Sequence, residues 1–263
     1  MEFNSLNKII NKKKEKLSLL KNIIKIEDLK YKIDKFNKYL NFKDKIYSNL
    51  SKGKFSLIAE IKKASPSAGV IIKDYNPADI AAIYEKNNAT CLSVLTEEDF
   101  FYGHLDHISK IKEQINLPIL CKDFFIDKFQ IPLAKSFGAD AILLIVAALN
   151  QNQLEELYNI ALEYKMSVII EVHTIEEAER ISGFNNAMIG INNRNLKTLK
   201  TDINTTFEIF KKLNNFEGVL ISESGINNKE DVLKISNQTN IKTFLIGESL
   251  LKNLNKNSIF SIL

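Results

Sequence analysis

Short apolar runs, rich in β-branched residues, recur along the chain and are separated by longer amphipathic segments. The runs are six or seven residues long and lie at 55–61, 89–95, 117–122, 140–146, 166–172, 187–192, 218–224 and 242–248. Predominantly apolar runs of this length are typical of strands that are buried on both faces, as in parallel sheets. Each run is therefore predicted to be a strand.

The segments between the runs carry apolar residues at helical spacing. One predicted helix starts at Asn76-Pro77, and another has Asn152 as its candidate N-cap. Thr174 is followed three residues later by Glu177, which is a capping-box pattern at the start of a third helix. Predicted strands and predicted helices thus alternate along the chain.

This alternation repeats eight times, at roughly 20–35 residues per unit, and favours parallel βαβ units. A count of eight indicates an α/β fold of the (β/α)8 TIM-barrel type, whose usual size is about 250 residues. A doubly wound sheet is the alternative, but the loop after the first run lacks the G-x-G-x-x-G pattern typical of that fold. We expect residues 51–263 to form the barrel as a single domain and residues 1–50 to form an N-terminal helical extension.

The positive charge of the chain is concentrated in this extension. The formal net charge is +4, but residues 1–50 alone hold 13 lysines and 6 acidic residues. A nucleic-acid-binding arm is one interpretation. Solvated faces of amphipathic helices are the preferred one, because Leu17, Leu20 and Ile24 recur among the lysines at near-helical spacing. We expect no nucleic-acid partner.

The apolar stretches, the N-terminus, the cysteines and the histidines bear on cellular location and on metal binding. No apolar stretch approaches the roughly 20 residues needed to span a bilayer, and the N-terminus lacks a signal-peptide core, so a cytoplasmic protein without a membrane partner is expected. Cys91 and Cys121 lie inside apolar runs and are expected to be reduced, buried thiols rather than zinc ligands. His104 and His107 are predicted to have surface or capping roles, so no metal site is expected.

Polar side chains gather where the predicted strands end. They are Glu60, Lys62, Lys122, Glu171, Asn192 and Arg194. In a barrel these ends meet around one mouth, where catalytic residues of this fold lie. Glu60 and Lys62 are two residues apart and should point to the same side, where burial requires that they pair. With Lys122 and Glu171 nearby, such a cluster would drive pKa values apart and supply proton donors and acceptors.

The seventh and eighth predicted strands are followed by glycine-containing loops. Gly225 and Gly247 could present backbone N–H groups to an anion, and many barrels bind phosphate at this position. Ordinary tight turns are the alternative. A phosphate site is the preferred interpretation, because both loops carry the pattern.

Taken together, these segments resemble the indole-3-glycerol phosphate synthase family from about residue 50 to the end of the chain. The matching segments are LIAEIKKASPSAGVI (57–71), SVLTEEDFFYG (93–103), PILCKDFFID (118–127), ADAILLIVAAL (139–149), IIEVHT (169–174), IGINNRNLKTL (189–199), SESGI (222–226) and FLIGESL (244–250). The resemblance implies a carboxy-lyase of tryptophan biosynthesis. Its substrate would be 1-(2-carboxyphenylamino)-1-deoxyribulose 5-phosphate, and it would need no metal or organic cofactor.

The resemblance also implies roles for the residues at the mouth. Lys122 would be the general acid for ring closure, and Glu171 the acid/base for dehydration. Glu60 and Asn192 would assist and position them, and Lys62 would contact the substrate carboxylate and help in dehydration. General acid–base catalysis of this kind is worth about 10²–10⁴-fold per group.

Further positions would bind the substrate. By resemblance the anthranilate ring, the ribulose portion and the phosphate would contact Ser65, Pro66, Phe101, Phe124, Arg194, Ser224, Gly225 and Gly247. Glu248 departs from the small hydroxyl residue that some family members have, so it is expected to give only its backbone N–H and to turn its side chain away. The N-terminal helices would fold over the mouth, and a monomer or weak homodimer is expected.

Two rival functions remain at this point. Phosphoribosylanthranilate isomerase uses a cysteine and an aspartate, whereas the first predicted strand here ends in Glu60 and Lys62. A non-catalytic barrel whose basic arm binds RNA is the second rival. The intact set of polar residues at the mouth argues against it.

Overall fold

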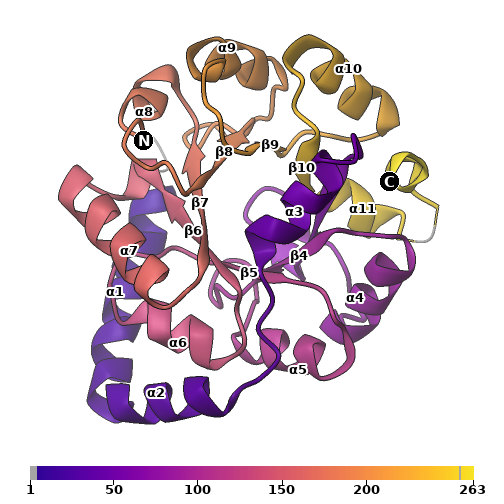
Figure 1. The fold of residues 1–263 in the computed structure, drawn as a ribbon. Helices are drawn as coiled ribbons and strands as arrows, with labels where there is room; N and C mark the ends of the chain where they lie inside the picture. Colours follow the sequence, from indigo (N-terminus) through magenta and orange to yellow (C-terminus); the bar gives the residue numbers. More distant parts are fainter. Residues whose placement is uncertain (1–4, 255) are drawn as a thin grey trace.

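Eight parallel strands close into a barrel in the part of the chain that the computed structural model describes, residues 5–254 and 256–263 (Figure 1). They are β1 (Ser56–Ile61), β4 (Cys91–Leu95), β5 (Ile119–Lys122), β6 (Ala141–Ile145), β7 (Ser167–Val172), β8 (Met188–Asn192), β9 (Leu220–Glu223) and β10 (Thr243–Ile246). Neighbours in the chain are neighbours in the barrel, and β1 closes it by pairing with both β4 and β10. Each predicted run contains one of these strands, so the TIM-barrel prediction is confirmed.

Helices follow the strands and cover the outside of the barrel (Figure 1). They are α4 (Pro77–Lys86), α5 (Asp106–Gln114), α6 (Gln130–Ser136), α7 (Gln151–Glu163), α8 (Ile175–Glu179), α9 (Asn204–Leu213), α10 (Lys229–Thr239) and α11 (Glu248–Lys252), with short 3-10 turns η1 (Val146–Ala148) and η2 (Ser258–Ile262). None of the helices in the described ranges has the length and apolarity needed to cross a membrane.

The predicted helix starts are correct with one exception. The side chains of Asn76 and Thr174 accept hydrogen bonds from the first turns of α4 and α8. The prediction that Asn152 caps α7 is wrong, because the cap is Asn150. Asn150 accepts from the backbone of Gln153, whose side chain accepts from the backbone of Asn150 in return. This reciprocal pair satisfies two N–H groups at once.

Alternation along the strands separates two layers of the core. In β1, Leu57 and Ala59 face the surrounding helices, whereas Ile58 faces the barrel interior together with apolar residues of the other strands. Glu60 lies two residues after Ile58 and shares its inward direction. The interior is therefore apolar near the start of the strands and becomes charged near their ends.

The N-terminal extension contacts both ends of the barrel through α1 (Ser5–Ile23), α2 (Ile26–Lys35) and α3 (Phe42–Leu50). Figure 1 shows α3 crossing one end of the barrel, where Phe42 and Ile46 are fully buried in the inner core. The helices α1 and α2 pack against α6 through a separate apolar cluster. At the opposite end α1 brings Leu6 and Ile9 to the mouth.

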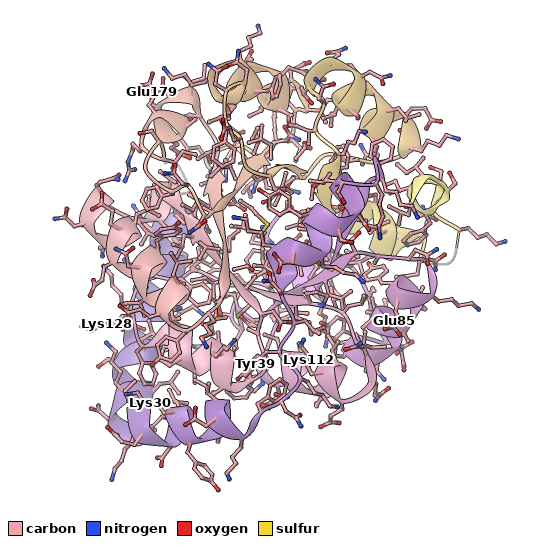
Figure 2. The ribbon with its side chains drawn as sticks, viewed as in Figure 1. Lys30, Tyr39, Glu85, Lys112, Lys128 and Glu179 are labelled. Atoms are coloured by element: carbon pink, nitrogen blue, oxygen red, sulfur yellow. The ribbon has the colours of Figure 1, made fainter. Side chains whose placement is uncertain are left out.

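A buried ion pair ties the segment between α2 and α3 to the barrel. Figure 2 shows that Lys30, Lys128, Glu85 and Glu179 lie at the periphery, whereas Lys112 lies inside. Its Nζ is 2.6 Å from Asp140 Oδ2, and both side chains are at most 2% exposed. Asp140 Oδ1 accepts from the backbone N–H of Leu40 at 2.7 Å.

Candidate active site

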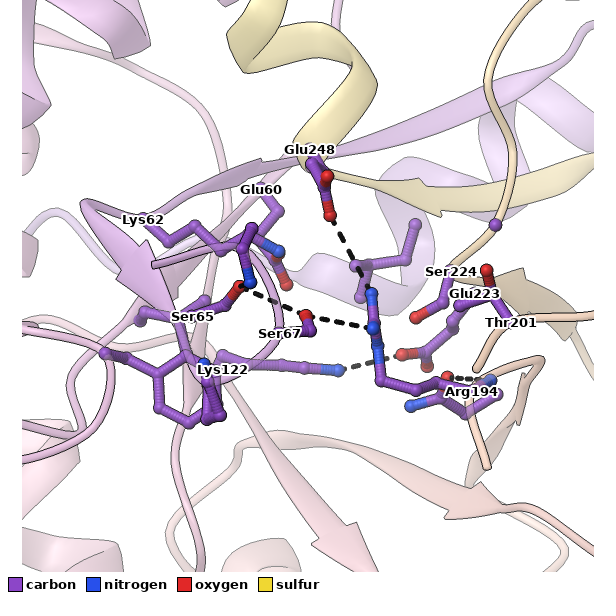
Figure 3. Close-up of a pocket in the computed structure, with 18 of the residues that line it drawn as sticks. Glu60, Lys62, Ser65, Ser67, Lys122, Arg194, Thr201, Glu223, Ser224 and Glu248 are labelled. Atoms are coloured by element: carbon purple, nitrogen blue, oxygen red, sulfur yellow. Dashed lines mark hydrogen bonds and ion pairs between the residues drawn. The ribbon is translucent and has the colours of Figure 1, made fainter. Parts of the chain in front are cut away.

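A cavity of about 680 Å³ opens at the carboxyl ends of the barrel strands (Figure 3). Every residue predicted to be catalytic or to bind substrate lines it: Glu60, Lys62, Ser65, Pro66, Phe101, Lys122, Phe124, Glu171, Asn192, Arg194, Ser224, Gly225, Gly247 and Glu248. The fold therefore brings together side chains that are spread over almost 190 positions of the sequence.

Lys122, at the end of β5, stands between two buried carboxylates. Its Nζ lies 2.9 Å from Glu171 Oε2 and 2.8 Å from Glu223 Oε2. Burial alone would lower the pKa of Lys122, but the charges of Glu171 and Glu223 outweigh burial and raise it. The ammonium is therefore held in its charged form at the centre of the site.

The two carboxylates differ in protonation although they share one lysine. Burial raises the pKa of Glu223 to about 8, and the attraction of Lys122 offsets this only in part because Glu171 repels a second negative charge. Burial also acts on Glu171, but Lys122 and His173 outweigh it and hold the pKa of Glu171 well below its usual range. Near neutral pH the arrangement contains an ionised Glu171 and a largely protonated Glu223.

Glu223 was not among the predicted catalytic residues. It lies inside the seventh predicted strand, 218–224, and only the residues that follow it were interpreted as a phosphate-binding loop; its side chain belongs to the last residue of β9 and is 1% exposed. The signal that could have found it is strand parity, because Glu223 lies two residues after the inward-facing Ile221. A Cβ at Gly190 on β8 would collide with the Glu223 carboxylate, so this glycine makes room for it.

Glu60 and Lys62 form the predicted ion pair at the end of β1. The Lys62 Nζ lies 2.5 Å from Glu60 Oε1, and the two side chains are 11% and 8% exposed. Tyr84 of α4 donates its hydroxyl to the backbone oxygen of Glu60 at 3.2 Å, which ties the strand end to the helix layer. The pair is largely shielded from solvent, so the surrounding barrel residues set its geometry.

A small hairpin, β2 (Ala64–Ser65) with β3 (Gly69–Val70), follows β1 at the mouth and was not predicted. Arg194 Nη1 donates to Ser67 Oγ in its turn at 3.0 Å and also to the backbone oxygen of Leu199 (Figure 3). The backbone N–H of Arg194 in turn donates to Asn192 Oδ1 at 3.0 Å. These contacts connect the hairpin to the loop after β8.

The Glu248 side chain lines the cavity, and its orientation relative to a bound phosphate stays a prediction. Its carboxylate is 2.7 Å from Lys252 Nζ and 3.9 Å from Arg194 Nη2, and Figure 3 shows it directed toward Arg194. The hydrogen bond from Lys252 is the main reason that the pKa of Glu248 is lowered. Two cations from different elements thus attract a carboxylate that sequence position alone would place near a repelling anion.

The cavity has an apolar side and a side lined by backbone. The rings of Phe101 and Phe124 lie 6.4 Å apart between centroids on the apolar side. Ser224 and Gly225 form part of the other side, and both have positive φ angles, 66° and 73°. Such a turn exposes successive backbone N–H groups, which can bind an anion.

The histidines have different surroundings. His104 lies at the surface, one of the two predicted roles, and its Nδ1 accepts a hydrogen bond from the backbone N–H of Asp106, the first residue of α5. The ring of His173 contacts a catalytic-site carboxylate: Nε2 lies 3.2 Å from Glu171 Oε1. Within residues 5–254 and 256–263 no group of three or more histidine, cysteine or acidic side chains is arranged to hold a metal ion.

Comparisons with known proteins agree with this geometry. The family model described as indole-3-glycerol phosphate synthase matches residues 6–262. A curated protein named indole-3-glycerol phosphate synthase from Prochlorococcus marinus subsp. pastoris is 47% identical over 256 residues, which are 95% of this chain and 85% of the relative. One of the same name from Trichodesmium erythraeum is 40% identical over 96% of this chain and 86% of its own length.

Solved structures share the fold at low sequence identity. A tryptophan synthase alpha chain from Legionella pneumophila superposes with a TM-score of 0.61 at 11% identity, covering 85% of this chain and 94% of that one. At this identity the likeness supports the barrel alone.

Proposed function

We propose catalytic roles for the residues at the mouth from one premise: the chain belongs to the indole-3-glycerol phosphate synthase family. Its reaction closes a pyrrole ring in 1-(2-carboxyphenylamino)-1-deoxyribulose 5-phosphate and releases CO₂ and water, giving indole-3-glycerol phosphate. The chain is thus a carboxy-lyase of tryptophan biosynthesis that acts on a phosphorylated small molecule.

The observation that carries the assignment is the position of the Lys122 ammonium between the two buried carboxylates of Glu171 and Glu223. Ring closure places negative charge on the ribulose carbonyl oxygen, and a positioned ammonium can protonate that oxygen. We assign this step to Lys122. Dehydration needs a base to accept a proton, and the ionised Glu171 beside Lys122 suits that role. Glu223 shares Lys122 and, with a pKa raised to about 8 by burial, can hold a proton at neutral pH.

Lys62 is assigned to the carboxylate that is lost as CO₂. Its Nζ is already paired with a carboxylate, that of Glu60, and an incoming carboxylate would share the same ammonium. Lys62 can also protonate the departing hydroxyl during dehydration. Asn192 holds the backbone of Arg194 and so positions the loop beside these groups.

Substrate binding is assigned to the two sides of the cavity. Ser65, Pro66, Phe101 and Phe124 would surround the anthranilate ring, and Arg194 the ribulose or the carboxylate. The backbone of Ser224, Gly225 and Gly247 would bind the phosphate, with the N–H of Glu248. The interactions of Glu248 with Arg194 and Lys252 support a backbone role only, because its carboxylate is engaged elsewhere.

The remaining expectations are proposals as well. We treat residues 51–263 as the catalytic barrel, with residues 1–50 as its extension. Contacts of α1 support the absence of a nucleic-acid partner, because Lys13, Lys16 and Lys21 pair with acidic residues of barrel loops, as in Lys13–Asp123 at 2.7 Å. The free, buried thiols of Cys91 and Cys121 support a reducing, cytoplasmic location. A monomer or weak homodimer stays a prediction.

Indole fluorescence tests the function directly. The protein is mixed with the carboxyphenylamino-deoxyribulose phosphate in the presence of a chelator, and product emission is followed. The chain contains no tryptophan, so the background is low. A rise establishes the reaction and its independence of free metal, whereas bound but unconverted substrate would contradict the catalytic assignment.

A further inference from the structure

Each oxygen of the Glu171 carboxylate has a different cationic neighbour. Oε2 lies 2.9 Å from Lys122 Nζ, on the cavity side. Oε1 lies 3.2 Å from His173 Nε2. His173 lies two residues beyond Glu171 and directly follows Val172, the last residue of β7, and its ring lies on the same side as the Glu171 side chain, as their contact shows. The catalytic roles proposed above use the lysine contact and leave the histidine contact unexplained.

The histidine is itself held from behind by the cap of α8. Glu177 Oε2 accepts a hydrogen bond from the backbone N–H of His173 at 2.7 Å and lies 3.3 Å from its Nδ1. Glu177 is fixed in turn because its backbone N–H donates to Thr174 Oγ1 at 3.3 Å. The capping segment that starts α8 therefore also fixes the imidazole ring.

His173 and Glu171 are buried, so a charge on either side chain would be costly without a partner. The side chains of His173 and Glu171 are 5% and 3% exposed. The groups that face His173 are Glu171 from β7 and Glu177 from α8, and those that face Glu171 are His173, Lys122 from β5 and Glu223 from β9. Burial opposes charging of the ring, but the two carboxylates outweigh it and raise the pKa of His173 to about 9. At neutral pH the ring is an imidazolium.

We propose that His173 is a positioning residue for the reaction. It acts as a cationic clamp that is braced by Glu177 and holds Oε1 of the Glu171 carboxylate. The proposal rests on the proposed role of Glu171. The ring Nε2 has no aligned hydrogen bond within the described residues, so its N–H is close to Glu171 but not pointed at it. Catalytic hydrogen bonds are often poorly aligned without substrate and tighten when it binds. If the Nε2–H of His173 aligns with Glu171 when substrate binds, it would fix the carboxylate with Oε2 directed toward the substrate proton that Glu171 accepts.

Two substitutions of His173 separate the effect of its side-chain length from the effect of its charge. In His173→Gln the amide nitrogen can replace Nε2 without its charge, whereas in His173→Asn the side chain is too short to reach Glu171. We expect His173→Asn to lower kcat about 10- to 100-fold with KM little changed, as for loss of a hydrogen bond to a charged group. His173→Gln should recover much of that loss. In both variants the acid limb of the kcat profile should move to higher pH, because loss of a cation raises the pKa of Glu171.

A second pair of variants tests the brace without touching the histidine. Glu177→Gln should shift the acid limb in the same direction by a smaller amount, because a neutral partner lowers the pKa of His173. Glu176→Gln is the matched control: it removes the same charge from the same helical turn, but this side chain is exposed and does not contact His173. It should leave kcat and the limb unchanged. Equal effects of the two variants would assign the shift to helix charge and overturn the proposal.

Histidine NMR gives a readout that needs no substrate. The chain has three histidines, and the signal that disappears in His173→Gln identifies the one of interest. Its titration should lie near pH 9 in the wild type and fall in Glu171→Gln. A clamp seen by NMR in an enzyme that does not convert the substrate would refute the proposed function alone. A neutral His173 at pH 7, or wild-type kcat and pH profile in His173→Asn, would refute the clamp.

Discussion

Replacing Lys122 by methionine removes the cation that two buried carboxylates share. Methionine keeps a similar length and apolar stem, so the main change is the loss of the ammonium from between Glu171 and Glu223, whose side chains are 3% and 1% exposed. Removing one partner of a buried ion pair is destabilising because it leaves an uncompensated charge. Lys122→Met should therefore lower the free energy of unfolding at neutral pH.

Protonation sets the upper limit of this loss. Glu223 is already largely protonated near pH 7, because its pKa is raised to about 8. Glu171 can escape its unpaired charge by binding a proton, which from a reference pKa of 4.5 costs about 3.4 kcal/mol at pH 7 and about 0.7 kcal/mol at pH 5. His173 remains beside Glu171 and reduces the penalty. We expect a loss of about 2–3 kcal/mol at pH 7.

The sign of the pH dependence follows from the same residue. In the wild type the pKa of Glu171 is lowered, so its contribution to stability is present above the unfolded pKa and is lost as pH falls. In Lys122→Met the pKa of Glu171 is raised by burial, so stability is full below the unfolded pKa and is lost as pH rises. The window from pH 7 to pH 5 lies above the unfolded pKa of 4.5, so the wild-type contribution is nearly constant there and the effect in the variant makes the difference between the two proteins shrink.

Urea unfolding followed by far-UV circular dichroism at the two pH values measures this difference. In the double variant Lys122→Met/Glu171→Gln the titrating carboxyl is removed while Lys122 stays absent. The deficit in unfolding free energy relative to the wild type should then no longer depend on pH between pH 5 and pH 7. A deficit that is equal at pH 5 and pH 7, or no deficit at pH 7, would refute the reasoning that the lysine compensates a buried Glu171 charge.

Three further predictions follow from the same structure. Lys122→Ala and Glu171→Gln should each lower kcat by about 10²–10⁴-fold in folded protein, measured by indole fluorescence, and wild-type turnover in either would remove that residue from the mechanism. Asp140→Asn should destabilise the protein by about 3–5 kcal/mol in urea unfolding without changing KM, because it leaves Lys112 buried and unpaired at the far end of the barrel. Gly190→Ala should lower kcat in protein that thermal unfolding shows to be folded, because its methyl group would displace the carboxylate of Glu223. Unchanged kcat would contradict this.

The strands could be predicted because burial on both faces leaves a clear sequence signal. All eight apolar runs contain a barrel strand in the described ranges, and their order gave the closed topology. The β2–β3 hairpin could not be found in this way, since two residues per strand are too few for a periodic pattern. The misplaced cap of α7 has a similar origin: Asn150 and Asn152 are both suitable, and only the reciprocal bond with Gln153 decides between them.

The site was predicted where strand parity was used and missed where it was not. Glu60 and Lys62 were paired correctly from their two-residue spacing. The same spacing after Ile221 points to Glu223, but parity was not applied to the seventh predicted strand, where attention went to the glycine loop that follows it. The direction of the Glu248 side chain depends on Lys252, four residues later in α11, and on Arg194, which only tertiary structure brings within its reach.

Two glycines, one in a strand and one directly after a strand, make room for two of the carboxylates at the barrel mouth. A Cβ at Gly190 would collide with the carboxylate of Glu223, and a Cβ at Gly247 would collide with that of Glu60. Neither glycine has a positive φ, so their backbone conformations do not require glycine. Space for an acidic side chain is therefore a sufficient reason for glycine at both positions, whether or not the N–H of Gly247 also binds phosphate. At this mouth the inward-facing acids Glu60 and Glu223 are each accompanied by a glycine that lies in, or directly after, the adjoining strand.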